Sequence, residues 1–300
     1  MAELVVATAA DAPRITELLN EISRARYGEA DLTEGEVTTL FGREKLEVLL
    51  AEQERETAVA YGDRYRQDAR DRSWLDVRAL DGHADAGALL LAELERRSLP
   101  DLDPGGRAMT WIAGMDAGMR GVVETAGYDY VRSSFRMAVG LGELARPEWP
   151  DGIAVSPYDA ADEEAVHAAQ QEAFRDHWEH RDEPLEEWRE WMVEPPSFDP
   201  SLWFVAREGD EIAGVSLCRT SHSGDAGHGH CSVLAVRRPW RRRGLGLALL
   251  RHSFVEMARR GMTRASLGVD AENLTGAVAL YERAGMRVER RNDCWQKQLR

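Results

Sequence analysis

Two short motifs of the same pattern lie 158 residues apart and divide the 300-residue chain into halves. Thr-Ala-Gly-Tyr, ending at Tyr128, and Arg-Ala-Gly-Met, ending at Met286, each follow a helical pattern and precede a strand-like run. Both halves also begin alike, with a short apolar run, an acidic residue and an amphipathic helical pattern. A repeat of this length predicts two copies of one fold arranged in tandem.

A segment rich in residues that interrupt helices and strands separates the halves. Residues 142–152 include Pro147, Pro150 and Gly152. We therefore predict a first domain over residues 1–145 and a second over residues 150–300. At roughly 150 residues, each half is long enough to form its own hydrophobic core.

The order of elements is clearest in the second half, where periodicity and breakers predict strands and helices in alternation. The predicted strands are residues 202–208, 212–219, 231–236 and 264–269, and the predicted helices are residues 245–260 and 274–283. This order indicates an α/β fold class, with a central mixed sheet flanked by helices in each half.

The charge balance and the cysteines restrict the function. The formal net charge is −15, which disfavours general nucleic-acid binding. Cys218, Cys231 and Cys294 are odd in number and lack metal-ligand spacing, so we expect a reducing compartment and no metal. The N-terminus lacks a secretion signal and no stretch resembles a membrane span, so the expected location is cytoplasmic.

A basic loop with two glycines joins a predicted strand to a predicted helix. Five arginines fall within residues 237–243, and Gly244 and Gly246 follow them. Glycines let the backbone approach a ligand closely, and the N–H groups of the first helical turn have no partner inside the helix. These groups lie at the positive end of the helix dipole, so the loop predicts a site for an anion such as a pyrophosphate.

Two other phosphate-binding motifs do not fit this loop. A P-loop ends in Gly-Lys-Ser/Thr, but Leu247 and Ala248 follow Gly246. A dinucleotide-binding fold has Gly-x-Gly-x-x-Gly after its first strand, whereas this loop follows at least two other strands.

The spacing Arg241-x-x-Gly244-x-Gly246 resembles the signature loop of the GCN5-related N-acetyltransferase (GNAT) superfamily. Residues 233–236 are similar to that family's fourth strand, Asn273 to the asparagine after its fifth strand, and residues 279–286 to its tyrosine-bearing helix. The resemblance covers residues 150–300 and implies acetyl-CoA as co-substrate, with no metal. It implies an enzyme that transfers an acetyl group to the primary amine of a small molecule.

The resemblance also implies roles for single residues. The implied coenzyme-binding residues are Leu234, Ala235, Val236, Arg241, Arg242, Arg243, Gly244, Leu245, Gly246, Leu247, Ala248, Asn273 and Tyr281. Tyr281 is also the implied acid for the departing thiolate. The chemistry agrees, because a neutral amine can attack a thioester directly and needs mainly hydrogen-bond donors and one acid.

The base is a separate question, which the residues leave open. Alternation along a strand would put His230, Ser232 and Leu234 on one face, so His230 is the predicted base, with a structural histidine as the alternative. Glu172 and His177 are weaker candidates. Carboxylates and tryptophans over residues 174–191 would suit a cationic amine, although a solvated helix with core tryptophans explains them equally well.

The first half resembles a decayed copy of the same fold. Its counterparts of Arg241, Gly244, Asn273 and Tyr281 are predicted to be Gly82, Asp85, Met115 and Val123. Acidic residues near the loop would repel a pyrophosphate, so we expect this half to bind no coenzyme.

The tandem layout resembles that of mycothiol synthases, which acetylate a cysteinyl-glucosaminyl-inositol. Two departures argue against that substrate: His230 stands where those enzymes carry a carboxylate, and Gly268 where they carry a tyrosine. That acetylation and a non-catalytic acyl-CoA-binding role remain the alternative functions. The expected partners are a small-molecule amine and no nucleic acid or membrane, and the chain is expected to be a monomer or homodimer.

Overall fold

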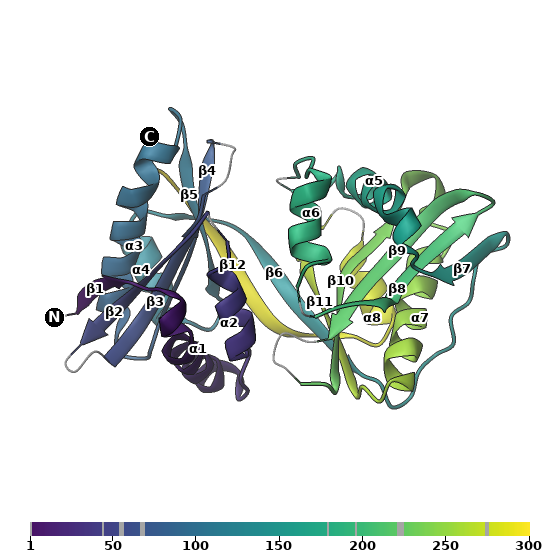
Figure 1. The fold of residues 1–300 in the computed structure, drawn as a ribbon, viewed down its shortest axis with the longest axis horizontal. Helices are drawn as coiled ribbons and strands as arrows, with labels where there is room; N and C mark the ends of the chain where they lie inside the picture. Colours follow the sequence, from purple (N-terminus) through teal and green to yellow (C-terminus); the bar gives the residue numbers. More distant parts are fainter. Residues whose placement is uncertain are drawn as a thin grey trace. The chain divides into compact units, whose positions relative to one another are not determined.

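The computed structural model describes residues 2–43, 45–53, 57–66, 70–178, 180–195, 197–220, 225–273 and 276–300. The chain folds as two compact units (Figure 1). Unit 1 comprises Met1–Ser134 with Arg290–Arg300, and unit 2 comprises Phe135–Glu289. Each unit has a mixed sheet flanked by helices, which confirms the predicted fold class.

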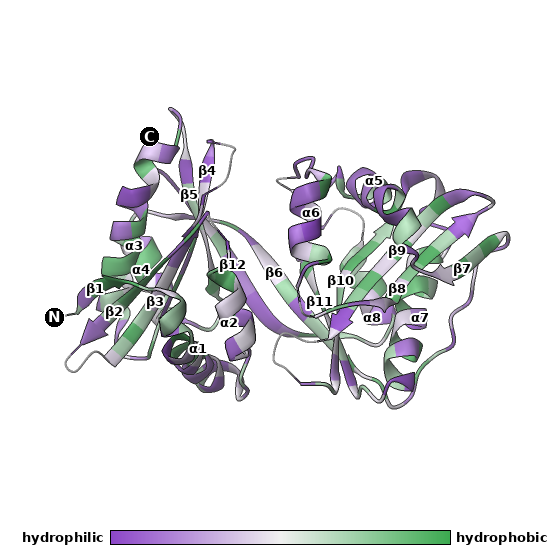
Figure 2. Cartoon of the chain, viewed as in Figure 1, coloured by the Kyte–Doolittle hydropathy of each residue, from purple (hydrophilic) through white to green (hydrophobic). Residues whose placement is uncertain are grey.

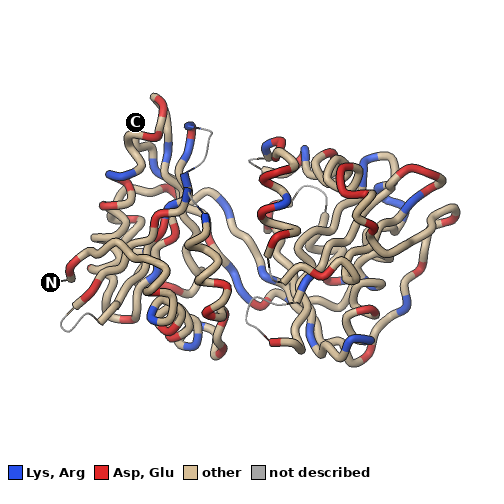
Figure 3. Tube along the Cα trace, in the orientation of Figure 1, with Lys and Arg blue, Asp and Glu red and all other residues tan. Residues whose placement is uncertain are grey.

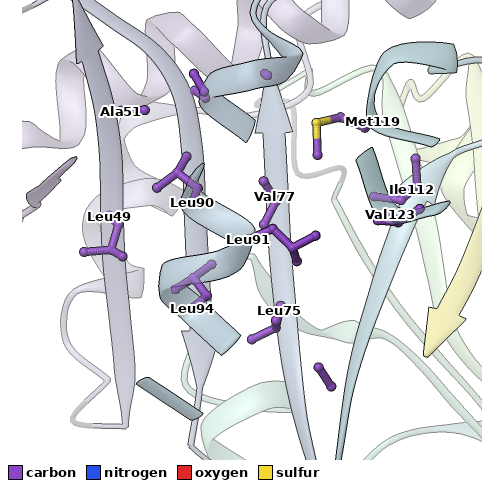
Figure 4. Close-up of a cluster of buried hydrophobic side chains, with 14 of the residues drawn as sticks. Leu49, Ala51, Leu75, Val77, Leu90, Leu91, Leu94, Ile112, Met119 and Val123 are labelled. Atoms are coloured by element: carbon purple, nitrogen blue, oxygen red, sulfur yellow. The ribbon is translucent and has the colours of Figure 1, made fainter. Parts of the chain in front are cut away.

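Unit 1 is built on a sheet in the order β1-β2-β3-β4-β5-β12, in which β4 and β5 are parallel. Its elements are β1 Glu3–Val6, α1 Ala12–Tyr27, α2 Glu34–Leu40, β2 Leu46–Gln53, β3 Thr57–Tyr65, β4 Arg72–Ala79, α3 Ala84–Ser98, β5 Arg107–Ala113, α4 Ala117–Thr125 and the first part of β6 Asp129–Gly140. Leucines of α3 point toward Leu49, Leu75 and Val77 of the strands and fill the core on one face (Figure 4). A second cluster, which includes Ile15 and Leu19 of α1, fills the other face.

Unit 2 has the order β11-β10-β9-β8-β7, with the end of β6 beside β11. Its elements are β7 Ile153–Pro157, α5 Glu163–Phe174, α6 Leu185–Met192, β8 Phe198–Glu208, β9 Glu211–Thr220, β10 His228–Val236, α7 Leu245–Arg259, β11 Arg264–Asp270, α8 Ala277–Arg283 and the first part of β12 Arg287–Gln298. The predicted first residue of the last helix, Leu274, lies outside the described residues. Hydrophobic stretches along β9 and β10 are visible in Figure 2. Helices α7 and α8 pack on one face of the sheet and α5 and α6 on the other.

The unit boundaries differ from the predicted ranges of 1–145 and 150–300, because the two halves exchange a strand. Strand β6 begins in unit 1 and ends in unit 2, where Leu141 N–H donates to the Thr263 carbonyl at 2.8 Å. Strand β12 begins in unit 2 and ends in unit 1, where residues 292–298 pair with β5. The last sheet position of each unit is therefore filled by the other half of the sequence.

Candidate functional site

The strands β10 and β11 pair at one end and separate at the other. They are parallel and in register from His228 opposite Arg264 to Cys231 opposite Leu267. Residues 232–236 of β10 and 268–270 of β11, all of them described, continue beyond this pairing. On its other side β10 stays paired with β9 as far as Val236. The opening thus leaves one edge of β10 with backbone groups that a strand partner does not satisfy.

A bulge lies where this opening begins. Cys231 pairs with Cys218 and Val233 with Leu217, so Ser232 is an extra residue in β10. Its Oγ is buried and has no hydrogen-bond partner in the part of the chain that the structure describes. A bulge re-aims the side chains that follow it.

The bulge corrects the expectation that His230 and Leu234 share a face. A side chain at Gly229 would meet Met257 of α7, so its neighbour His230 faces the opposite side, toward α5 and α6. Leu234 comes after the bulge and packs with Leu245 and Leu249 on the α7 side. Strand alternation predicted one face because a bulge leaves no clear mark in the sequence.

Helix α7 begins at the open end of β10. Gly244 caps it with φ of +87°, which strongly favours glycine. The Ala248 N–H donates to the Gly244 carbonyl at 3.1 Å, so the N–H groups of residues 245–247 precede the first helical hydrogen bond. A Cβ on Gly246 would lie 3.1 Å from Leu280 of α8, so glycine keeps this turn close to its neighbour. These features meet the requirements of a phosphate site.

Most arginine side chains of this loop pair with carboxylates of the protein. Arg237 pairs with Glu172 at 2.6 Å, Arg241 with Asp176 at 2.9 Å and Arg243 with Glu208 at 2.8 Å, and Arg238 also pairs with Asp176. Hydrogen bonds from Arg238 and Arg241 lower the pKa of Asp176 to about 2. Figure 3 shows basic and acidic residues interspersed along the trace of both units.

Arg242 differs from the other arginines of the loop. It is exposed, has φ of +65° and has no ion-pair partner among the described residues. The guanidinium groups of the other arginines in this loop are held in ion pairs with carboxylates. The guanidinium of Arg242 is therefore the one in the described part of the loop that can contact a phosphate without first breaking an ion pair. Arg241 instead fastens the loop, because it also donates to the carbonyls of Val236 and Ala173.

Tyr281 and Asn273 lie on the β11 side of the opening. Tyr281 is 8% exposed and packs in the cluster that contains Cys231 and Leu267. Burial raises the pKa of the Tyr281 phenol well above its ordinary value, so the hydroxyl stays protonated at neutral pH. Asn273 follows the end of β11, and its N–H donates to the Asp270 carbonyl at 3.1 Å.

Two histidines on the α5 side share one hydroxyl group. Ser266 Oγ on β11 lies 3.0 Å from Nδ1 of His230 and 2.9 Å from Nε2 of His228. The sequence indicated both histidines but not Ser266, which is 36 residues from His230 and reaches it only through the parallel register. A serine in an apolar strand is the one signal that could have suggested it.

Glu172, His177 and Glu183 lie on α5 or in the segment that follows it. Glu172 is held by Arg237, as described above. Burial lowers the pKa of half-buried His177, which favours its neutral form, and burial raises the pKa of Glu183. Trp188 is fully buried and donates to Gln170 at 2.9 Å, so it belongs to the core, whereas Trp191 is partly exposed.

The corresponding opening in unit 1 is built differently. Strands β4 and β5 pair from Arg72 opposite Arg107 to Leu75 opposite Thr110, but β4 pairs with β3 without a bulge. Arg26 donates to the Ala79 carbonyl at 3.0 Å and pairs with Asp116, the cap of α4, at 2.5 Å. These two side chains are 10% and 9% exposed, so a buried ion pair spans the opening.

The loop after β4 also corrects the predicted alignment. Helix α3 begins at Ala84, so the loop is residues 80–83 only. His83 therefore corresponds to Gly244, and Asp85 lies within the first turn of the helix. The loop after β10 spans residues 237–244, so the unit 1 loop is four residues shorter.

The described ranges contain neither a candidate metal site nor a candidate membrane-spanning helix. No group of three or more His, Cys, Asp or Glu side chains there is arranged to hold a metal ion. No helix in the same ranges is long and apolar enough to cross a membrane.

Comparison with known proteins places these features in a family. The profile of the Acetyltransferase (GNAT) family matches residues 163–286, which include β10, α7 and α8. A GCN5-related N-acetyltransferase from Sphaerobacter thermophilus has 30% identity and a TM-score of 0.83, over 100% of this chain and 96% of that one. A tandem GNAT protein from the clavulanic acid biosynthesis pathway has 13% identity and a TM-score of 0.79. The match covers 100% of this chain and 99% of that one, so the two proteins share the fold.

Curated relatives match over a shorter length. A mycothiol acetyltransferase from Kineococcus radiotolerans is 33% identical over 204 residues, which are 66% of this chain and 63% of that protein. A mycothiol acetyltransferase from Streptomyces bingchenggensis is 31% identical over 189 residues, which are 61% of this chain and 60% of that protein. The matches thus span about three fifths of these relatives.

Proposed function

Because the chain belongs to the GCN5-related N-acetyltransferase family, we propose that it transfers an acetyl group from acetyl-CoA to a primary amine of a small molecule. The observation that carries this proposal is the opening of β10 beside the N-terminus of α7. An extended coenzyme arm needs unpaired strand edges, and a pyrophosphate needs unpaired N–H groups at a helix start. Unit 2 offers both within one strand–loop–helix segment.

The residues of unit 2 divide the task. The N–H groups of residues 245–247, with Arg242, would bind the pyrophosphate, and the backbone of residues 234–236 would pair with the coenzyme arm. Asn273 would contact the arm from the other side. The coenzyme supplies an activated acetyl group, so the protein's task is to position the amine, remove its proton and stabilise the leaving thiolate.

Tyr281 suits the last of these tasks. A phenol with a raised pKa is a weak acid, so its main contribution would be a hydrogen bond to the developing thiolate. We expect Tyr281→Phe to lower kcat by about 100-fold, at the lower end of the ~10²–10⁴ typical of acid–base groups. The affinity for acetyl-CoA should change little, because the ring and its packing are kept. Steady-state kinetics and calorimetry on the same protein would measure both.

A matched control exists in unit 1. Tyr128 is also buried, in the core cluster of that unit. Tyr128→Phe should leave kcat unchanged if the Tyr281 effect is specific. Equal losses in both variants would show general damage by loss of a buried hydroxyl and would remove Tyr281 from the mechanism.

We propose that unit 1 binds no coenzyme. The ion pair of Arg26 with Asp116, the short loop and the regular register of β4 support this. Titration calorimetry should give one acetyl-CoA per chain. Removing the ion pair with Arg26→Ala should leave this stoichiometry at one, because the loop after β4 would still be short and β4 would still have no bulge. Two equivalents bound by the unmodified protein would contradict the proposal.

A more specific candidate substrate comes from the curated relatives. Several proteins about 30% identical to this chain are named mycothiol acetyltransferase, which favours a cysteinyl-glucosaminyl-inositol as the acceptor amine. His230 and Gly268 stand where the resemblance would place a carboxylate and a tyrosine, which favours another amine. Acetyl transfer to that compound, tested beside polyamines, amino acids and aminoglycosides, would separate the two. If no amine is acetylated while acetyl-CoA binds, the chain is a coenzyme-binding protein without turnover.

A further inference from the structure

The guanidinium group of Arg241 joins three parts of unit 2. Its Nε donates at 3.0 Å to the carbonyl of Val236, the last residue of β10. Its Nη2 donates at 2.8 Å to the carbonyl of Ala173, in the last turn of α5, where carbonyl groups lack a partner inside the helix. Its Nη1 donates to the carboxylate of Asp176 at 2.9 Å. A residue of the proposed pyrophosphate loop therefore caps the end of α5.

Asp176 holds this guanidinium group from the segment that follows α5. The helix ends at Phe174, and Asp176 lies two residues further along the chain. The same carboxylate also pairs with Arg238, so two arginines of the loop converge on it. Their hydrogen bonds lower the pKa of Asp176 to about 2, so the carboxylate is charged at neutral pH. The segment of residues 175–178 is thereby fastened to the loop.

His177 shows where this segment lies. Its ring packs against that of Phe174, with 4.2 Å between the ring centroids, and its N–H donates to the Phe174 carbonyl at 2.8 Å. Burial lowers the pKa of the His177 ring, the charge of Asp270 raises it and that of Arg241 lowers it, so the ring lies near both groups. Asp270 is the last residue of β11, and Arg241 follows the end of β10. The segment therefore lies beside the open end of these two strands.

We propose that Asp176 and Arg241 are positioning residues, which hold residues 175–178 and the proposed pyrophosphate loop in one fixed arrangement at the open end of β10 and β11. The effect on coenzyme affinity rests on the proposed function, whereas the position of the segment does not. Because the loop and the segment share one guanidinium group, a change that frees the segment also loosens the loop. Loosening the loop weakens binding, since its N–H groups are then no longer held ready for the ligand.

Charge alone predicts the opposite effect. Asp176 is an acid beside a proposed anion site, so its removal would strengthen the binding of a pyrophosphate if only charge mattered. Glu208 provides a matched control, because it pairs with Arg243 of the same loop at 2.8 Å but belongs to β8. The two carboxylates are similarly exposed, at 33% for Asp176 and 40% for Glu208. Alanine at either position removes one negative charge, but only Asp176→Ala releases residues 175–178.

Titration calorimetry of the full-length protein with acetyl-CoA separates position from charge. Asp176→Ala should weaken binding about fivefold, near the upper limit for a partly exposed ion pair. Glu208→Ala should leave the affinity unchanged or raise it. Thermal unfolding should be similar for the two variants, because both pairs lie near the surface. Unchanged or tighter binding by Asp176→Ala would overturn the proposal, and so would equal losses in the two variants.

Proton NMR of the His177 ring measures the position of the segment without any ligand, and His177→Gln assigns its signal. In Asp176→Ala a released ring enters water, so its pKa should rise toward the ordinary value of about 6.5. Loss of the neighbouring negative charge would by itself lower that pKa further. Glu208→Ala should leave the His177 titration as it is in the unmodified protein.

The two measurements fail separately. A His177 pKa that stays the same or falls in Asp176→Ala shows that the carboxylate does not hold the segment, and it overturns the proposal. If the unmodified protein binds no acetyl-CoA but Asp176→Ala still raises the His177 pKa, the proposed function is wrong and the positioning of the segment stands.

Discussion

Replacing Gly244 with aspartate is expected to weaken acetyl-CoA binding about 100-fold, equivalent to roughly 2.7 kcal/mol. An aspartate at this position would accept hydrogen bonds from the first-turn N–H groups of α7, which are the groups proposed to bind the pyrophosphate. Its negative charge would also repel the phosphates at the positive end of the helix. Calorimetry with the purified full-length protein would measure the change.

Gly82 gives a closely matched control. Its φ is +84°, against +87° for Gly244, and a Cβ at either position would have no neighbour within 4 Å. Aspartate should therefore strain the backbone equally in Gly82→Asp and Gly244→Asp, at a cost of about 1 kcal/mol each. Thermal unfolding should show similar shifts for the two variants, whereas coenzyme affinity should fall only for Gly244→Asp. A comparable loss of affinity in Gly82→Asp would place coenzyme in unit 1.

Separating the chain within residues 142–152, the segment between the two halves, should prevent both halves from folding. A fragment of residues 150–300 lacks β6 and with it Met137 and Leu141, which are 0% and 5% exposed in the core of unit 2. Loss of one such side chain typically costs about 2–5 kcal/mol, and a whole domain is stable by only about 5–15 kcal/mol. A fragment of residues 1–145 likewise lacks the end of β12, including Cys294 and Trp295.

Circular dichroism and thermal melts of each fragment would test this expectation. Neither fragment should show a cooperative transition alone, and the two expressed together should form a 1:1 complex that melts cooperatively. A control chain cleaved within residues 142–152 after folding should keep its melting transition, because both exchanged strands are then already in place. Cooperative unfolding of residues 150–300 alone would contradict the exchange.

Several features of this protein could be predicted from local sequence patterns. Strand and helix periods gave the elements of unit 2 to within a few residues, and the repeat gave the tandem layout. The loop from Arg237 to Gly246 indicated an anion site because its chemistry is local: glycines, arginines and a helix start within ten residues. Tyr281 and Asn273 were indicated by resemblance, and their roles remain proposals.

Other features depend on which strands lie side by side, and only the tertiary structure decided them. The bulge at Ser232 changes the face of every later residue of β10, yet a bulge is defined by two strands together. The arginines of the loop looked available for phosphate until Glu172, Asp176 and Glu208, distant in sequence, proved to be their partners. The link from Ser266 to His230 needs the parallel register of β10 with β11.

The exchange of β6 and β12 has the same cause. Each of these strands is the last strand of its own half of the sequence. Its residue pattern allows it to pair equally well in the sheet of the other unit. The sequence by itself determined that there are two related halves and most of the strands and helices of the second half, and it indicated the loop in which an anion site is expected. The tertiary structure decided which half completes which sheet, since pairing between strands far apart in the chain depends on the whole assembled core.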